Sequence, residues 1–422
     1  MYSISLIDRT NLGLAFVAGM EGDLGLDVGN RYTVIVMVFF MAYIVFEIPS
    51  NIILPKAGAA NWLAFLGVSF GAILIGMGFT YSWVTMTACR ALFGCTYLIT
   101  CWYKRFDVGK RLAAFWLISV VLNAFAAIFA YALTLLEGTH GLNGWRWIFI
   151  VEGAITVGVC AIGWLIIIDF PTKADEFQSP EEKRFVIDRI YHDRGDAEED
   201  PLTAAKILHH LKDWKLYFWA FNLMASTLPG YAYSYFKTII LTGMGLTGNE
   251  SQLLSAPPYI VAAAATYFSG RLTDRCSQLS ACSTAYGQTN GARYFGVFMG
   301  VGFLQFCIPG VLAFQANNIT SHSKRAVASA TCLIGGGLGG IIASVAFKSS
   351  ESPFYTTGIW VTFGVTMVSI CMNVTMNVYF WKVNKKTKAT GGRIEGRIQV
   401  QLRISVGYLS DIQRIRQISA LA

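Results

Sequence analysis

Charged residues are scarce in this chain of 422 residues. They make up 14% of it, whereas soluble domains carry about 25%, so the sequence cannot build a surface that faces water on every side. Histidine is scarcer still, with five residues that lie in or beside loops and lack metal-ligand spacing. Because no convergent catalytic set is visible, we expect no enzyme activity, no metal and no cofactor.

Acidic residues are outnumbered, with 25 Asp and Glu against 33 Lys and Arg and a net charge of +8. In a soluble protein this excess would suggest nucleic acid as a partner. Here the bases gather in the gaps between apolar runs, which is typical of cytoplasmic loops of membrane proteins. Most of the nine cysteines lie inside apolar runs and are interpreted as small buried hydrophobic residues. We therefore expect a lipid bilayer as the partner, and no nucleic acid.

Hydrophobic residues are abundant, at 54%. A spanning helix needs about 20 mostly apolar residues, and this length predicts eleven spans. A charged stretch separates the first six spans from the others. The predicted units are an N-terminal transmembrane half of six helices (1–168), a charged cytoplasmic linker (169–213), a C-terminal half of about five helices (214–382) and a basic, disordered cytoplasmic tail (383–422).

The positions of Lys and Arg place the N-terminus in the cytoplasm, because the connections on that side of the first eight spans hold most of the bases. Beyond the eighth span the alternation fails. Eleven alternating spans would put Lys324, Arg325 and the basic tail outside. Either one helix of the architecture is missing near residues 276–290, or the last third is inserted abnormally.

Several short motifs carry a resemblance to a known family. Gly270-Arg-Leu-Thr-Asp-Arg275, after the eighth span, resembles the loop signature of the major facilitator superfamily. Further motifs resemble the anion:cation symporter family, and within it the fungal allantoate permease type. These are Asp8-Arg-Thr-Asn-Leu-Gly13, Phe39-Phe-Met-Ala-Tyr43, Phe46-Glu-Ile-Pro-Ser-Asn51, Cys101-Trp-Tyr-Lys-Arg105 and Gly144-Trp-Arg-Trp-Ile-Phe149 with Glu152-Gly153, followed by Lys324-Arg-Ala326.

The resemblance implies an all-α membrane protein with two six-helix halves related by a pseudo-two-fold axis, of whose twelve helices about eleven are present. It also implies roles for four residues: Arg9 and Arg90 as anion contacts, Tyr43 as a hydrogen-bond donor to the substrate, and Asp8 as the acid that couples proton and anion. Gly270, Asp274 and Arg275 would form the loop that controls the conformational change.

The residues themselves support part of this assignment. An ionisable side chain at membrane depth is costly unless it is paired, and is a functional candidate by default. The guanidinium of Arg9 suits a carboxylate, and Asp8 can gain or lose a proton. The other interpretation is a local pair at a helix end, because Asp8 lies only about 11 Å along a helix from Met1 and could reach the headgroups.

Polar residues inside other apolar spans have two interpretations, as a lining of the transport pathway with its gate or as hydrogen bonds that hold the bundle. They are Glu47, Asn51, Asn123 and Asn222. A break in the seventh span is expected at Pro229. Relative to the family pattern, about nine residues are missing after Gly94, including the second coupling acid. A loss of about nine helical residues is not a whole number of turns, so we expect that Arg90 cannot keep both its depth in the membrane and the helix face on which it lies. The run 333–341 has Gly337 where relatives tend to have Asn.

These observations predict a secondary transporter that moves a small organic anion, a carboxylate or a ureide such as allantoate, together with protons by alternating access. The alternative is a non-transporting or misassembled truncated product of such a gene. We expect a monomer in the plasma membrane, where nutrient anions enter.

Overall fold

The computed structural model describes residues 2–96, 108–166, 204–268, 322–347 and 355–389, with residue 351 and a few residues between 291 and 315. Every regular element in these ranges is helical. Five described helical segments are long and apolar enough to cross a bilayer, namely Ala60–Gly78, Leu117–Thr134, Gly144–Ile166, Val327–Ala346 and Thr356–Tyr379. The linker between 167 and 203, most of the span at 293–314 and the tail beyond 389 lie outside the described residues.

The first span is not one straight helix. α1 (Tyr2–Ala15) leads into a π-helical turn, η1 (Phe16–Met20), and then into the short α2 (Glu21–Leu24). Gly19 in this turn has a φ of 106°, which a residue with a side chain adopts only with strain. The remaining helices of the N-terminal half are α3 (Arg31–Ala57), α4 (Ala59–Gly78), α5 (Trp83–Thr96), α6 (Val108–Thr134) and α7 (Gly144–Ile166), with the 3-10 turn η2 (Thr139–Gly141) before α7.

The seventh span is continuous in the structure, although the sequence predicts a break at Pro229. Pro229 is buried inside the helix that holds this span, and in a tightly packed bundle the missing backbone donor is tolerated. The later helices are α9 (Ala204–Leu211), α10 (Trp214–Thr242), α11 (Gly248–Leu254), α12 (Pro257–Phe268), α15 (His322–Ala346) and α16 (Thr356–Ala389).

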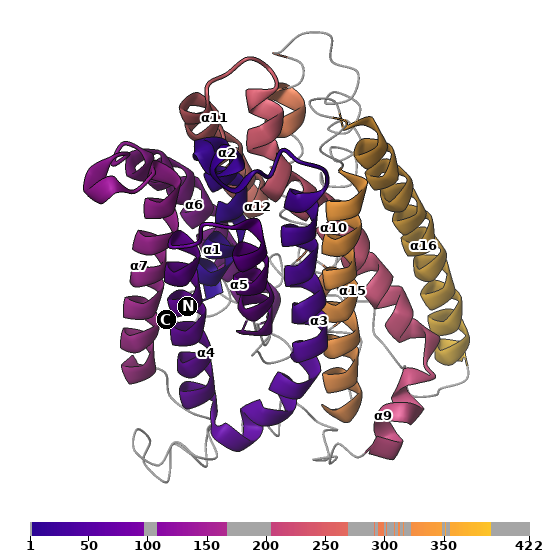
Figure 1. Cartoon of the computed structure of the whole chain (residues 1–422). Coiled ribbons are helices and arrows are strands. Elements are labelled where there is room, and N and C mark those ends of the chain that lie inside the picture. Colours follow the sequence, from indigo (N-terminus) through magenta and orange to yellow (C-terminus); the bar gives the residue numbers. More distant parts are fainter. Residues whose placement is uncertain are drawn as a thin grey trace, which may run out of the picture.

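The glycine-rich helix α15 lies between α10 of its own half and α3 of the other half (Figure 1). Its glycines allow a close approach on both sides. A Cβ atom on Gly335 would meet the backbone oxygen of Ala220 on α10, and one on Gly340 would meet the ring of Phe40 on α3. Gly337 also faces α3, beside Ile44, so a larger residue there needs a shift of these helices.

The two halves also meet where α6 packs against α12. Val120 and Ala124 of α6 form one buried apolar cluster with Tyr259 and Ala262 of α12. The α3–α15 contact and the α6–α12 contact each join one helix from each half of the chain. Two bundles joined in this way can rock against one another, which is the arrangement that alternating access needs.

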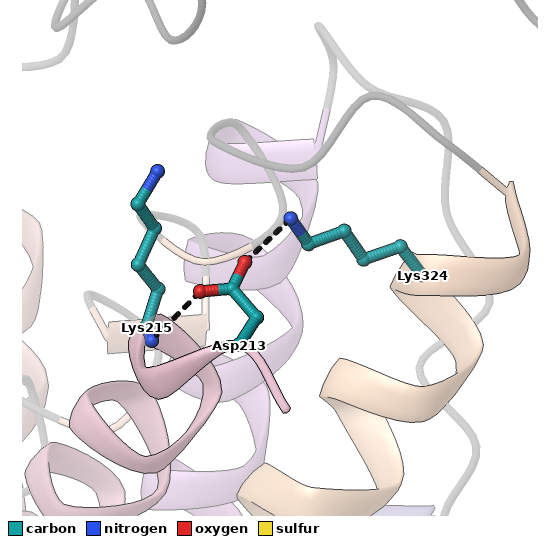
Figure 2. A network of polar contacts seen from close by, with 3 residues as sticks. All are labelled: Asp213, Lys215 and Lys324. Atoms are coloured by element: carbon teal, nitrogen blue, oxygen red, sulfur yellow. Dashed lines mark hydrogen bonds and ion pairs between the residues drawn. The ribbon is translucent and has the colours of Figure 1, made fainter. Parts of the chain in front are cut away.

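Helix α15 begins at the same end of the bundle as α10. Asp213 caps α10 by accepting a hydrogen bond from the backbone N–H of Lys215 at 3.1 Å, and its other oxygen pairs with Lys324 Nζ of α15 at 2.6 Å (Figure 2). Helix α16 ends there too, since Tyr379 contacts Trp214 at the start of α10. We call this the basic end. Lys324 therefore lies on the predicted cytoplasmic side, and eleven alternating spans are excluded for this structure.

The ionised carboxylate of Asp213 contributes to the free energy of unfolding, and this contribution depends on pH. Partial burial works toward a higher pKa, but the hydrogen bonds from Lys324 and the Lys215 backbone, with the charges of both lysines, outweigh it and hold the pKa of Asp213 below its ordinary value. This contribution is present above the pKa of an unfolded Asp and is lost as the pH falls through the lowered value.

Two substitutions separate the ion pair from the helix cap. Asp213→Asn keeps a good cap and is expected to cost about 0.5 kcal/mol at neutral pH, while Asp213→Ala is expected to cost about 1 kcal/mol more. Thermal unfolding of the detergent-solubilised protein at neutral and acidic pH measures both. Equal losses for the two variants, or a loss for Asp213→Asn that persists in acid, would contradict this assignment.

At the opposite end of the bundle the two halves are in direct contact. Thr238 of α10 donates a hydrogen bond to the backbone oxygen of Gly13 at 2.8 Å, and Gln252 of α11 donates to that of Leu14 at 2.9 Å. Tyr32 of α3 donates to the backbone oxygen of Tyr235. The helices α2 and α11 lie together at this end, at the top of Figure 1. Because the basic end is predicted to be cytoplasmic, this is the predicted outer end, and hydrogen bonds hold the two halves together there.

Candidate functional site

Asp8 lies deep in the bundle and faces α7. Its side chain is 1% exposed, and its Oδ2 accepts a hydrogen bond from Thr156 Oγ1 at 2.6 Å. Thr156 stands near the midpoint of α7, so Asp8 is about halfway through the bundle. The interpretation as an exposed pair at a helix end does not describe this structure. Asp8 and Arg9 also make no direct ion pair among the salt bridges of the described residues.

Arg9 faces the other half of the protein. Its Nη1 donates to the hydroxyl of Tyr231 on α10 at 3.3 Å, and its guanidinium carbon lies 4.6 Å from the centre of that ring. Successive residues on a helix point about 100° apart, so Asp8 can contact α7 while Arg9 reaches α10. Tyr231 and Tyr235, one turn apart, both pack against Phe40.

Arg90 joins this site from α5. It is 1% exposed, and its Nη2 donates to the backbone oxygen of Arg9 at 3.5 Å. Its Nε and Nη1 have no hydrogen-bond partner within the described residues. The positive charge of Arg9 and the negative charge of Asp8 both act on its guanidinium. The site therefore holds a buried guanidinium with donors to spare.

The shortening after Gly94 that the resemblance implies does not turn Arg90 out of the site. Phe93 stacks on Phe70 of α4 with ring centres 3.8 Å apart. Gly94 lies so close to α3 that a Cβ atom would meet the backbone oxygen of Phe39. These contacts fix the rotation of α5 within one turn of Arg90. Residues 97–107, which follow the point where the resemblance implies missing residues, lie outside the described residues.

Asn123 lies beside the arginine site. Thr10 Oγ1 donates to its Oδ1 at 3.4 Å, and its own Nδ2 donates to the backbone oxygen of Ser119. Tyr43 is buried on α3 beside Gly337 of α15, and Glu47 is buried one turn further on. Asn51 belongs to α3, and its side chain lies outside the described part of the structure.

Asn222 lies in a different place, between α10 and α16. Its Oδ1 accepts hydrogen bonds from Ser369 Oγ at 2.8 Å and from Asn373 Nδ2. It stands nine residues before Tyr231, or about 13 Å along the helix. These contacts fit the interpretation as hydrogen bonds between helices. The loop residues Gly270, Asp274 and Arg275 lie outside the described residues.

Three further buried charged residues are not among those predicted from the sequence. One of them, Arg146 at the start of α7, donates to the backbone oxygens of Gly78 and Thr80; the other two are Glu152 and Lys237. Glu152 of α7 is 5% exposed and stands one turn from Thr156. Lys237 of α10 is 4% exposed, and its Nζ lies 4.0 Å from the centre of the Tyr259 ring on α12, a cation–π contact. The rule that selects Asp8 and Arg9, an ionisable residue inside an apolar run, applies equally to these two.

Fold and site together define a class. Two bundles that contain helices of membrane length meet along two helix pairs. Asp8 and Arg9 of α1 are buried near mid-depth, where Asp8 contacts α7 of its own half and Arg9 contacts α10 of the other half. Such residues mark ion and substrate pathways, and a site between two rocking bundles is the arrangement of a secondary transporter.

Comparison with known proteins identifies the family. The family model of the Major Facilitator Superfamily matches residues 1–391, and the chain belongs to this superfamily of transporters. It is similar to the MFS transporter prlL of a fungal species, with 30% identity over 94% of this chain and 86% of that one. It is also similar to the high-affinity nicotinic acid transporter of Saccharomyces cerevisiae, with 26% identity over 92% and 76%.

Solved structures confirm the major facilitator fold. A bacterial homologue of the human lysosomal transporter Spinster, in an inward-facing and occupied conformation, aligns with a TM-score of 0.62 at 12% identity over 90% of this chain and 97% of that one. The proton:xylose symporter XylE aligns with a TM-score of 0.60 at 12% identity over 90% and 95%. The chain is thus a multi-pass integral membrane transporter.

Proposed function

We propose that this transporter carries a small organic anion, a carboxylate or a ureide such as allantoate, in symport with protons. One observation carries the proposal: Arg90 is fully buried, lies next to Arg9, and has two donor atoms without a partner in the described residues. A buried guanidinium that lacks an anionic partner is strongly destabilising. An anionic substrate supplies that partner and accepts two parallel hydrogen bonds.

Arg9 and Tyr231 form the second side of the proposed anion site. Their contact joins α1 to α10. The binding of an anion by both arginines would therefore depend on how closely the two halves approach each other. Tyr43 stays a proposed substrate contact from α3, and Glu47, Asn51 and Asn123 stay proposed lining residues. Gly270, Asp274 and Arg275 stay the proposed conformational loop.

Asp8 is the proposed coupling acid. The charge of Arg90 acts on it, and this charge favours the ionised carboxylate. When a substrate carboxylate neutralises Arg90, that support weakens and Asp8 holds a proton more readily. Proton binding and anion binding then favour one another, and such linkage is reciprocal. This is the thermodynamic requirement for symport.

The relatives support the charge of the cargo. One of them is, by its name, a transporter of nicotinic acid, which carries a carboxyl group. The choice among carboxylates and ureides depends on side chains around the two arginines, and we propose the plasma membrane as the site of action and a monomer as the working unit.

Uptake into proteoliposomes that contain the full chain tests the proposal. We expect labelled nicotinate or allantoate to accumulate when the outside is acidic, and a protonophore to abolish accumulation. Nicotinamide, which has nearly the same shape but no charge, is the matched control and should not accumulate. Equal uptake of nicotinamide, or uptake of the anions that ignores the gradient, would overturn the proposal. No uptake of any anion in the panel would favour the non-transporting alternative.

A further inference from the structure

The resemblance to the anion:cation symporter family implies a second coupling acid in a segment that this sequence lacks after Gly94, and the structure offers a different acid in Glu152 of α7. We propose that Glu152 of α7 is this transporter's second proton-carrying acid and forms, with Asp8, one shared proton site. The inference rests on the proposed proton symport and adds to it the residue and the helix that complete the proton site.

The two acids belong to helices that are in contact, α1 and α7, and the charge of Asp8 acts on Glu152. The two helices run antiparallel: Trp145 at the start of α7 donates a hydrogen bond to Asp23 just after η1, while Thr156 bonds to Asp8 deeper in the bundle. Thr156 and Glu152 are four residues apart and share a helix face. The face that holds Asp8 through Thr156 therefore presents Glu152 one turn nearer the outer end.

The oxygens of this acid pair lack partners. Both oxygens of Glu152 and the Oδ1 of Asp8 are buried without a hydrogen-bond partner within the described residues. Two ionised carboxylates in such surroundings repel each other and pay the full cost of burial. One shared proton removes both costs, because a protonated carboxyl is a donor and the ionised one an acceptor. Coupled acids of this kind titrate as a pair.

Few other charged groups act on this pair. Asp8 is the charged neighbour of Glu152, and Arg90 is the cation whose charge acts on Asp8. Helix α4, which packs along α7, has no ionisable residue in its sequence, and η1 has none either. From α6 the described ionisable side chain is Tyr131, and further along α7 the buried thiol of Cys160 lies within range of Asp8.

The charges of the combined site fit one proton and one anion. With both acids ionised, Asp8 and Glu152 balance Arg9 and Arg90. With one proton held between the acids the site carries a net charge of +1, which a monocarboxylate returns to zero. Moving both ligands together thus avoids carrying a net charge through the low-dielectric bundle. Asp8 alone, opposite two arginines, would leave an excess of positive charge in either state.

Glu152→Gln tests the inference, because it keeps the shape of the side chain and removes the titratable group. In proteoliposomes we expect exchange of labelled for unlabelled anion at equal pH to continue, and gradient-driven accumulation to be lost. In weakly buffered detergent solution, proton uptake on anion binding should fall from about one per anion to none. Glu250→Gln, at an exposed helix cap where Gln also fits, is the matched control and should behave as wild type.

The outcomes separate this inference from the proposed function. If the wild type itself ignores the proton gradient, the proposed symport fails. If the wild type responds and Glu152→Gln accumulates anion equally well, only the role of Glu152 fails, and the same holds if a folded Glu152→Gln loses exchange as well. Should Glu152→Gln not fold, Thr156→Val keeps both acids and removes the bond to Asp8. We expect it to shift the pH dependence of uptake while exchange persists, and an unchanged pH profile would overturn the inference.

Discussion

Replacing Arg90 by glutamine is expected to raise the anion concentration for half-maximal uptake about a hundredfold, since removing one partner of a buried ion pair costs about 3 kcal/mol. The side chain is 1% exposed and has two donors without partners in the described residues, so no water-facing group can take over its role. Arg90→Lys keeps the charge but loses the planar fork, and we expect an intermediate loss. Concentration series of labelled anion in proteoliposomes measure both variants.

A second arginine offers the matched control. Arg31 donates to the backbone oxygen of Gly25 at 2.9 Å and lies over the ring of Trp83, away from the site. Arg31→Gln should leave the half-saturating concentration unchanged. If Arg90→Gln also left it unchanged while transport continued, the anion site would have to be moved elsewhere in the bundle.

Adding one methyl group to Gly335 is expected to disrupt the C-terminal half. A Cβ atom there would clash with the backbone oxygen of Ala220, and a backbone atom cannot move aside without separating α10 from α15. Overpacking of this kind costs about 1–3 kcal/mol or more, against about 1 kcal/mol gained from the better helix propensity of alanine. We expect Gly335→Ala to lower the yield of monodisperse protein and its melting temperature.

Replacing Gly364 by alanine is expected to change the stability in the opposite direction from Gly335→Ala. It lies inside α16 with open space where its Cβ would be, so Gly364→Ala should stabilise the helix by about 1 kcal/mol. The melting temperatures of the two variants should therefore move in opposite directions from that of the wild type. A shift in the same direction for both would mean that the α10–α15 contact is looser than described.

Much of the fold is predictable from the sequence, because apolar runs of membrane length and short family motifs depend on local residues. The burial of Asp8 and Arg90 is less so. The helical rise from Met1 predicts that Asp8 lies near a membrane surface. The helical rotation over the residues that the family pattern has after Gly94 predicts that Arg90 points away from the site. Both estimates treat a helix as isolated, whereas the contacts of Phe93, Gly94 and Thr156 with neighbouring helices set the actual depth and rotation.

The direction of α15 could not be predicted for a similar reason. The count of apolar runs leaves an odd number of spans. The start of α15 is placed by contacts with the start of α10, namely the pairing of Lys324 with Asp213 and the apolar cluster of Val327 and Ala328 with Leu216. Glu152 is a different case, since its position inside an apolar run is visible in the sequence. Its significance depends on a neighbour from α1, which is separated from α7 by seven helical and turn elements, and a linear pattern does not reveal that contact.

Asp8 and Arg9 are joined by one peptide bond, yet they are anchored to different moving parts. Asp8 is tied to α7 within its own half, whereas Arg9 is tied to Tyr231 in the other half. If the halves separate during transport, the first attachment travels along intact and the second must break. The proton site at Asp8 would then stay intact within one half of the protein. The anion site at Arg9, which is shared between the halves, would form and break once in every transport cycle. A bound anion would thus stabilise the contact between the two halves, and protonation would favour that state by favouring anion binding.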